Sequence, residues 1–282
     1  MPLCTSISSL TQSLSAFRQK DESVGFIPTM GALHEGHGSL VEMALSENEA
    51  VVVSIFVNPT QFNNAADLEK YPRPFAQDVA FLEAIHKDII VFAPTANELY
   101  SGKVQSKSYN FGGIELAMEG QHRPGHFDGV GTVLDLLFRA VKPTKAYFGE
   151  KDFQQLQIVR KLVEIEKLPV EIVGCPIHRA QSGLAMSSRN RRLTKDQLEA
   201  APFIFEQLQK AQKSFDSTSI PALQRAAEEA FRGHPILKLE YFEIAATHNL
   251  KTAYRKDHRN TYRAFVAAFA GEVRLIDNIA LN

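Results

Sequence analysis

Two histidines, His34 and His37, stand three residues apart in a glycine-containing stretch directly after a short apolar run. If that run is a strand and a helix follows it, both rings share one face of the helix start and can donate to phosphate oxygens together. Backbone N–H groups and the positive end of the helix dipole would point at the same ligand. A zinc site is disfavoured, because the H-E-x-x-H spacing is absent and no third ligand is close in sequence. Two surface histidines at a helix start explain the pair equally well.

Amide side chains mark the end of the next apolar run, at Asn58 and Gln61 in the segment V-N-P-T-Q-F. Open α/β sheets bind ligands outside the carboxyl ends of their strands, which is where these amides would lie. An Asn-Pro pair is also an ordinary turn that ends a strand, so this segment is a weak signal by itself.

A charged turn, Gly149–Asp152, follows another apolar run and precedes a helical pattern. Asp152 is predicted to be the N-cap of that helix. Lys151 is predicted to project toward the crevice that holds the two histidines. A solvated charge cluster with a capping aspartate is the plainer alternative.

A hydroxyl-rich loop brings Ser187, Ser188 and Arg189 together in sequence. Hydroxyl groups and a planar guanidinium are suited to phosphate oxygens. The loop lies where the pattern of the sequence changes, so we expect it at a domain junction, able to close over a nucleotide.

The elements that must position these groups follow from hydrophobic periodicity. Short apolar runs rich in β-branched and aromatic residues predict strands buried on both faces, at 24–27, 50–57, 89–93, 146–148 and 170–177. An amphipathic N-terminal helix precedes them, and patterns of helical period separate them, at 40–45, 68–85, 133–141 and 153–168. Strands that alternate with helices predict a parallel, doubly wound α/β sheet, which we assign to a domain of residues 1–180.

The remaining residues, 181–282, have a different order of elements. Helical patterns over 194–215 and 221–231 come first, and strand-like runs at 239–244, 262–269 and 273–276 follow. Helices followed by strands predict a second, smaller α+β domain.

The composition excludes several classes of protein. Lys and Arg total 31 against 32 for Asp and Glu, so the net charge of −1 gives no footprint for nonspecific binding to nucleic acid or to an anionic membrane. The two cysteines, Cys4 and Cys175, cannot supply a disulfide framework or a four-thiolate metal site. No secretory pattern opens the sequence and no run approaches the ~18 apolar residues of a membrane span. We therefore expect a cytoplasmic protein with no membrane segment and no nucleic-acid partner.

Taken together and in this order, the four segments resemble the pantothenate synthetase family, the pantoate–β-alanine ligases. The resemblance runs from Val24 to the ending Arg274–Asn278, and landmarks such as Tyr71-Pro72-Arg73, Glu119-Gly120 and Arg123–Phe127 agree with it. The H-x-G-H segment alone is shared with a wider superfamily of nucleotidyltransferases and class I aminoacyl-tRNA synthetases. Joined to V-N-P-x-Q-F, G-E-K-D-F-Q-Q-L and S-S-R-N, it is highly specific.

The resemblance implies a Rossmann-like N-terminal domain that binds ATP and pantoate, a small C-terminal domain that acts as a lid, and a homodimer. It implies a ligase of pantothenate and coenzyme A biosynthesis, which condenses pantoate with β-alanine through a pantoyl-adenylate and releases AMP and pyrophosphate from ATP. Mg²⁺ is expected to arrive on the phosphates of ATP rather than in a protein metal site.

The resemblance also assigns residues. His37 takes the position of the catalytic proton donor, and His34, Lys151, Ser188 and Arg189 suit the neutralisation of phosphate charge. Gln61 matches a contact to both pantoate and β-alanine, and Gln155 matches a second pantoate contact. His178 is expected to meet the adenine through its backbone. The complete ATP-binding set is Met30, Gly31, Ala32, Leu33, His34, Glu35, Gly36, His37, Gly149, Glu150, Lys151, Asp152, His178, Met186, Ser187, Ser188 and Arg189.

Three positions depart from the family pattern. Gly38 stands where a larger apolar residue is usual, His178 stands where an aliphatic residue is more typical, and Thr60 stands where Met is common. Two other functions remain open at this point. One is a nucleotidyltransferase that acts on a phosphorylated small molecule and releases pyrophosphate without AMP. The other is a regulatory module that binds a nucleotide and turns nothing over.

Overall fold

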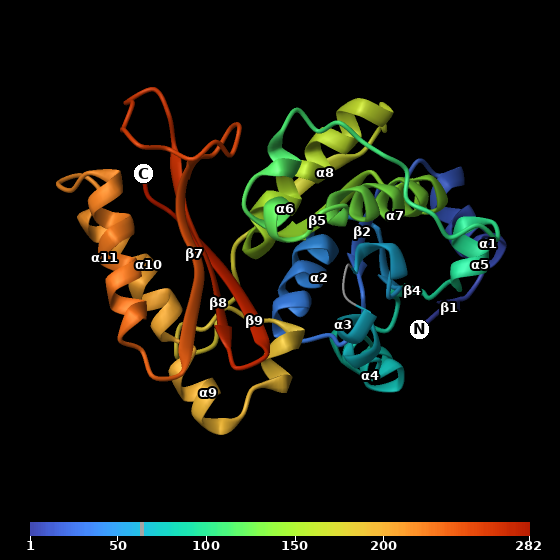
Figure 1. The fold of residues 1–282 in the computed structure, drawn as a ribbon. Coiled ribbons are helices and arrows are strands. Elements are labelled where there is room, and N and C mark those ends of the chain that lie inside the picture. Colours follow the sequence, from blue (N-terminus) through green and yellow to red (C-terminus); the bar gives the residue numbers. More distant parts are fainter. Residues whose placement is uncertain (63–64) are drawn as a thin grey trace. The chain divides into compact units, whose positions relative to one another are not determined.

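The computed structural model describes residues 1–62 and 65–282, and the chain packs as two units (Figure 1). The first unit consists of Met1–Glu115, Glu119–Glu150 and Gln155–Pro176. The second consists of Ile177–Asn282 together with two short segments from earlier in the chain, Leu116–Met118 and Lys151–Gln154. Lys151, one of the predicted phosphate-binding residues, therefore packs with C-terminal residues.

The first unit is built on a parallel sheet, as the alternation of elements predicts. In the described residues the strand order is β1-β4-β3-β2-β5-β6, and each pair of neighbours is parallel. The strands are β1 (Leu3–Cys4), β2 (Val24–Thr29), β3 (Ala50–Ile55), β4 (Ile90–Phe92), β5 (Lys145–Gly149) and β6 (Glu171–Cys175). The Rossmann-like fold class is confirmed. Strand β1 was not predicted, because two residues are too few to show a hydrophobic period.

The order of the strands reverses between β2 and β5. From β2 the chain moves outward through β3 and β4, and it then returns to β5 on the other side of β2. Doubly wound sheets bind ligands outside the carboxyl ends of the strands that flank such a reversal. The His34–His37 segment follows β2, and Glu150 follows β5. The topology thus places the carboxyl ends of β2 and β5, which these segments follow, at the same edge of the sheet.

Burial explains why β2, β3 and β4 are continuously apolar. Phe26, Ile27, Val52, Val53 and Val91 are all completely buried, on alternating faces of their strands. The same expectation is wrong for β6, because it is an edge strand in which Glu171 is exposed and only Cys175 is buried. The helices of this unit cover the sheet (Figure 1). They are α1 (Ile7–Gln19), α2 (Glu35–Glu47), α3 (Ala65–Lys70), α4 (Phe75–Ile85), α5 (Ala96–Tyr100), α6 (Glu119–His122), α7 (His126–Val141) and α8 (Phe153–Glu166), of which α8 begins in the second unit.

The prediction of one helix over 68–85 is wrong. Helix α3 ends at Lys70 and α4 begins at Phe75. Pro72 and Pro74 lie between them, and proline has no N–H to donate and disfavours the helical conformation of the residue before it. The hydrophobic period continues across the two helices, so only the prolines indicate the break between them.

The second unit is α+β, as predicted. Its antiparallel sheet has the order β7-β8-β9, with β7 (Leu237–Ala246), β8 (Tyr262–Ala270) and β9 (Val273–Ala280). Helices α9 (Lys195–Ala200), α10 (Phe203–Ser214) and α11 (Ile220–Arg232) precede it. Leu208 and Phe231 from the helices share a hydrophobic cluster with Ile244 and Val266 from the strands.

The helix predicted over 194–215 is also two helices. Helix α9 ends at Ala200, and α10 begins at Phe203 after Pro202. A proline in the interior of a helix removes one hydrogen bond and clashes with the carbonyl of the preceding turn. In the part of the chain that the structure describes, no helix is both long enough and apolar enough to cross a membrane.

Candidate active site

A tight loop joins β2 to α2 and carries the first predicted ATP-binding segment. Gly31 and Ala32 have positive φ angles of 80° and 51°, a conformation that glycine adopts readily and alanine rarely. The N–H of Gly31 donates to Oγ1 of Thr29 at 3.1 Å. A Cβ at position 31 would lie 2.9 Å from a carboxylate oxygen of Asp78, so the loop needs glycine there.

Asp78, in the first turn of α4, holds this loop in place. Its carboxylate is 2% exposed and accepts the N–H of Ala32 at 2.9 Å and the N–H of Leu33 at 2.7 Å. A buried carboxylate requires such partners, and the bonds keep Ala32 in its strained conformation. The motifs of the sequence did not point to Asp78. One signal was available: Asp78 precedes Leu82 by four residues, so an acidic side chain lies on the apolar face of the helix and should be buried with partners.

These bonds correct one expectation about the loop. The sequence predicts that its backbone N–H groups point at the ligand. In the structure the N–H groups of Gly31, Ala32 and Leu33 are bonded to protein oxygens, and that of Gly36 donates to Nδ1 of His34 at 3.1 Å. Buried backbone donors take partners within the fold, so the loop acts as a rigid mount for its side chains.

His34 and His37 lie side by side at the start of α2, as their spacing predicts. His34 is the N-cap residue, and the two ring centroids are 4.1 Å apart. Because Nδ1 of His34 accepts the N–H of Gly36, a neutral His34 ring carries its proton on Nε2. Both rings are partly buried. The pair can therefore offer imidazole donors to one anionic group.

The turn after β3 is fixed by Asn58, which is 1% exposed. Its Nδ2 donates to the carbonyl of Gly129 on α7 at 3.1 Å, and its Oδ1 accepts the hydroxyl of Tyr100 at 2.6 Å. A Cβ at Gly129 would lie 2.3 Å from the carbonyl oxygen of Thr60, so α7 packs directly on this turn. Asn58 is thus an anchor for the 3₁₀ turn η1 (Pro59–Gln61), which carries Gln61.

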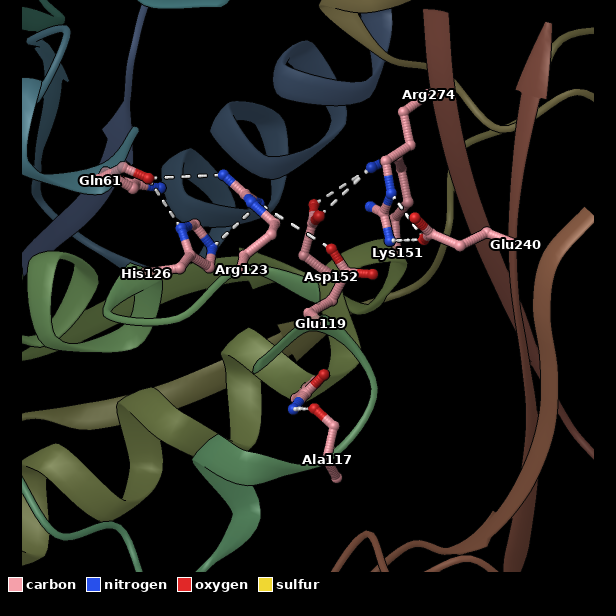
Figure 2. A network of polar contacts seen from close by, with 10 residues as sticks. Gln61, Ala117, Glu119, Arg123, His126, Lys151, Asp152, Glu240 and Arg274 are labelled. Atoms are coloured by element: carbon pink, nitrogen blue, oxygen red, sulfur yellow. Dashed lines mark hydrogen bonds and ion pairs between the residues drawn. The ribbon is translucent and has the colours of Figure 1, made fainter. Parts of the chain in front are cut away.

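The backbone of Gln61 is held from the other side by Arg123 and His126 (Figure 2). Nδ1 of His126 lies 2.9 Å from the carbonyl oxygen of Gln61, so this nitrogen carries the proton. Nε2 of His126 lies 3.2 Å from Nη1 of Arg123, which also lies 3.9 Å from the carboxylate of Glu119. In the sequence these residues were only landmarks of the family, and in the structure Arg123 and His126 support the backbone of a predicted substrate contact.

Lys151 lies in the 3₁₀ turn η3 (Glu150–Asp152), between β5 and α8. Helical geometry begins before Asp152, so the prediction that Asp152 is the N-cap is wrong. Its carboxylate instead lies 3.3 and 3.4 Å from the ammonium of Lys151 (Figure 2). The Lys151 side chain is 18% exposed. The carbonyl of Lys151 accepts Nδ2 of Asn278 at 2.9 Å.

Two neighbouring glutamines on α8 have different surroundings. Gln154 is buried, and its Nε2 donates to the carbonyl of Ala117 at 2.8 Å. Gln155, the predicted pantoate contact, is only partly buried and belongs to the first unit. Consecutive helical residues point about 100° apart, so Gln155 cannot share the environment of Gln154.

The late loop of the second unit is a hairpin followed by a short turn. The N–H of Met186 donates to the carbonyl of His178 at 3.0 Å, which brings two predicted ATP-binding residues together. Ser187 then caps the 3₁₀ turn η4 (Ser188–Arg192), and its Oγ accepts the N–H of Arg189 at 3.3 Å. Ser188 and Arg189 thus begin a defined turn.

The predicted site residues fall on both units. The first unit brings His34 and His37 into contact and carries Gln61 and Gln155 on separate elements, η1 and α8. The second unit joins His178 to Met186 and Ser187 to Arg189, and it includes Lys151.

The structure gives reasons for two of the three departures from the family pattern. A Cβ at Gly38 would lie 3.2 Å from the ring of Phe81, so this aromatic ring fills the space that a larger residue would need. The hydroxyl of Thr60 lies 3.1 Å from both Oδ1 of Asn58 and the hydroxyl of Tyr100, where Met could make no such bond. His178, the third, is exposed.

Comparison with known proteins gives a consistent result. A family model of pantoate-β-alanine ligases matches residues 2–280. The pantothenate synthetase of Christiangramia forsetii is 54% identical over 273 residues, which cover 97% of this chain and 96% of the relative. That of Bacteroides thetaiotaomicron is 44% identical, with coverage of 99% and 98%.

Solved structures agree. The pantothenate synthetase of Thermus thermophilus superposes with a TM-score of 0.91 at 38% identity, with 100% of this chain and 99% of that one covered. A pantoate-β-alanine ligase from Francisella tularensis, described as a complex with β-γ ATP and β-alanine, gives a TM-score of 0.80 at 36% identity, with coverage of 100% and 98%. The match in sequence and fold extends over the whole chain, and the chain belongs to the pantoate-β-alanine ligase family.

Proposed function

We propose that this chain condenses pantoate with β-alanine and converts ATP to AMP and pyrophosphate in doing so. Membership of the ligase family over residues 2–280 supports the reaction, and the ATP and β-alanine named for the Francisella relative support the ligands. The observation that carries the proposal is the pair of imidazole rings, 4.1 Å apart at the N-terminus of α2, beside the reversal of strand order. This is a suitable place for the phosphates of a nucleotide.

The first step is adenylation of pantoate. A carboxylate oxygen of pantoate attacks the α-phosphorus of ATP, and the bond from that phosphorus to the bridging oxygen breaks. Pyrophosphate leaves with the electron pair. His37 donates a hydrogen bond or a proton to the phosphate oxygens as charge moves onto them, and Nε2 of His34 donates beside it.

The second step forms the amide. The amine of β-alanine attacks the acyl carbon of pantoyl-adenylate, the bond from that carbon to the AMP oxygen breaks, and the amine loses a proton. There is little covalent chemistry for side chains in either step. Positioning and charge neutralisation therefore dominate, and Lys151, Ser188 and Arg189 supply them together with the histidine pair.

The remaining contacts follow the family assignment. ATP meets the segments Met30–His37, Gly149–Asp152 and Met186–Arg189, and its adenine meets the backbone of His178. Gln61 contacts both pantoate and β-alanine, and Gln155 contacts pantoate. Neutral amides suit this role, because an arginine would bind the carboxylate tightly and reduce its reactivity as a nucleophile.

Mg²⁺ fits this set of side chains as a companion of ATP. The groups proposed at the phosphates are imidazole, ammonium, hydroxyl and guanidinium, which are donors to phosphate oxygens and not the carboxylate ligands that Mg²⁺ prefers. In the described residues no three His, Cys, Asp or Glu side chains converge as a metal-ligand set. Bound to ATP, the ion would neutralise charge on the phosphates while the side chains hold their orientation.

The family resemblance also supports expectations about organisation. Residues 1–180 would form the domain that binds ATP and pantoate, and residues 181–282 the lid. We expect a homodimer and a cytoplasmic location, which sedimentation analysis and cell fractionation would test.

One incubation separates this function from the two alternatives. Purified protein with ATP, Mg²⁺, pantoate and β-alanine should yield pantothenate, AMP and pyrophosphate in equal amounts. A nucleotidyltransferase would release pyrophosphate without AMP, and a regulatory module would leave ATP intact. Either of these results would refute the proposal.

Isotope labelling tests the intermediate. Pantoate with ¹⁸O in its carboxylate should pass one labelled oxygen to AMP, because the attacking oxygen stays on phosphorus when the amine expels the nucleotide. Pyrophosphate should also form before β-alanine is added, in an amount close to that of the enzyme. Label in inorganic phosphate, together with ADP, would show that the acid is phosphorylated instead.

A further inference from the structure

Strand β9 contains two neighbouring polar residues, Asp277 and Asn278, to which the proposed reaction gives no role. Both are buried, with exposed fractions of 5% and 1%. Successive side chains of a strand point to opposite faces, so a polar group is buried on each side of the sheet at this point. Such groups need hydrogen-bonding partners, and the partners show what these residues hold.

The amide of Asn278 links the sheet to the turn η3, which carries Lys151 and is called the lysine turn below. Its Oδ1 accepts a hydrogen bond from Nη1 of Arg263, and its Nδ2 donates to the carbonyl of Lys151 at 2.9 Å. Arg263 pairs with Ala280 across β8 and β9, so it lies diagonally opposite Asn278 on the same face. A guanidinium can only donate and a carbonyl can only accept. One orientation of the amide therefore satisfies both partners.

Arg263 is itself fixed against the same segment. Its guanidinium carbon lies 4.2 Å from the ring centroid of Phe153, and the Phe153 ring packs against Phe265 with centroids 6.0 Å apart. The segment Lys151–Gln154 is thus anchored at a backbone carbonyl and, two residues later, at an aromatic ring. Strands β8 and β9 set the position of the Lys151 main chain, although Asn278 follows Lys151 by 127 residues.

Asp277 does the same for the hairpin that carries His178 and Met186. Its carboxylate accepts Nη1 and Nη2 of Arg179 at 2.6 and 2.9 Å. Arg179 also stacks on the ring of Phe205 at 3.7 Å and forms an antiparallel bridge with Ala185 inside the hairpin. Adjacent residues of one strand therefore hold both the hairpin and the lysine turn.

We propose that Asn278 is a positioning residue for the adenylation step: by holding the carbonyl of Lys151, it fixes the place from which the ammonium of Lys151 meets the phosphate oxygens of ATP. This inference rests on the proposed function. Asn278 acts through Lys151 and is not itself a catalytic residue. Asp277 holds the hairpin through Arg179, so this part of β9 is a common anchor for two nucleotide-binding segments.

The variant Asn278→Asp tests the contact with little change of shape. It keeps an oxygen for Arg263 and replaces the donor to Lys151 with an oxygen that repels the carbonyl. The rate of pyrophosphate formation from ATP and pantoate should fall about 10- to 100-fold, because a small misplacement of a positioned group can cost about 10² in rate. Conversion of supplied pantoyl-adenylate by β-alanine and the KM for pantoate should change by less than about threefold.

A double-mutant cycle shows whether the effect passes through Lys151. In a Lys151→Ala background, Asn278→Asp should slow pyrophosphate formation by less than about twofold, because residues that act as one unit are not additive. If the two substitutions multiply their separate effects, Asn278 acts elsewhere and the proposal is wrong.

Gln212→Ala is the matched control. The amide of Gln212 also donates to a backbone carbonyl of β9, that of Ala280, at 2.7 Å. Loss of this amide should lower the thermal midpoint of unfolding and leave unchanged the ratio between the rate of pyrophosphate formation and the rate of pantoyl-adenylate conversion.

If Asn278→Asp does not fold, Arg263→Lys tests the same contact, because it loosens the orientation of the amide and should give the same selective loss at smaller size. Equal slowing of both half-reactions in the folded variant would overturn the proposal. A wild-type protein that makes no pantothenate would refute the proposed function instead.

Discussion

The loop after β2 and the turn after β5 are both fixed through their backbones, but through opposite halves of the peptide group. In the first unit the carboxylate of Asp78 accepts the N–H groups of Ala32 and Leu33. In the second unit the amide of Asn278 donates to the carbonyl of Lys151. Asp78 carries two bonds to one loop, whereas Asn278 carries one bond and is itself held by Arg263.

This difference shows how the two segments that we propose to bind the nucleotide are held. In each case buried protein groups take up backbone polar atoms, which leaves the side chains for the proposed chemistry: imidazoles in the first segment and an ammonium in the second. The holding residues also require opposite chemistry. An acceptor is essential at position 78 and a donor is essential at position 278, so exchanging acid and amide should damage both places.

The largest effect should come from a side chain that the first loop presents. If His37 donates to phosphate oxygens in the transition state, His37→Ala should lower kcat by about 10²–10⁴-fold, with a smaller change in the KM for ATP. Rates of pyrophosphate release measure this. Near-normal turnover in the folded variant would remove His37 from the mechanism.

His34→Asn is the companion variant, because Asn can still cap α2 while the ring is lost. It should keep the thermal midpoint close to that of the wild type and lose activity. If stability falls and activity stays, His34 is only a cap.

Asp78→Asn should give the next largest effect. The new amide can accept one N–H of the loop but meets the other with a donor, so a buried N–H loses its partner at a cost of about 1–3 kcal/mol in the free energy of unfolding. The loop that positions His34 and His37 should then shift, so kcat should fall about 10- to 100-fold. Denaturant titration and steady-state kinetics measure both changes.

Asp88→Asn is the control for Asp78→Asn, because the Asp88 side chain is 73% exposed and its ion pair with His86 spans 4.0 Å. It should change neither stability nor rate appreciably. If Asp78→Asn behaves like this surface variant, the carboxylate does not hold the loop.

Gln155→Ala should have an intermediate effect confined to one substrate. The loss of a hydrogen-bonding partner for pantoate costs about 1–3 kcal/mol, which should raise the KM for pantoate and leave that for ATP nearly unchanged. Gln154→Ala provides the contrast, because the amide of Gln154 donates to the carbonyl of Ala117. This variant should lower stability more than it changes substrate binding. A change in the KM for ATP alone would show that Gln155 lines another pocket.

Ser187→Ala should give the smallest effect. Its Oγ caps only a short 3₁₀ turn through a 3.3 Å bond to the N–H of Arg189, so we expect a loss of about 0.5–1 kcal/mol in the free energy of unfolding. The KM for ATP should rise a few-fold as Arg189 becomes less ordered. An effect as large as that of His37→Ala would mean that the hydroxyl itself contacts the reacting phosphate.

Local patterns in the sequence were sufficient for much of the fold. The runs around Phe26, Val52 and Tyr147 are continuously apolar because both faces of their strands are buried, and that burial appears in the residue types themselves. The contact between His34 and His37 could be predicted for a similar reason, because a spacing of three residues places both side chains on one face of the helix start. Pro72, Pro74 and Pro202 also marked the helix breaks in the sequence, but the hydrophobic period continued across them and favoured single helices.

The sequence by itself therefore determined the parallel sheet, the histidine pair at the start of α2 and the family, since each is visible in residue types and spacings that lie close together in the chain. Only the tertiary structure showed that Asp78 takes the N–H groups of the first loop, that His126 and Arg123 hold the backbone of Gln61, and that Asn278 holds Lys151. These contacts join residues that are between 45 and 127 positions apart. No periodicity covers such separations. The partner of a buried polar group is decided by which elements pack together, and that depends on the whole chain.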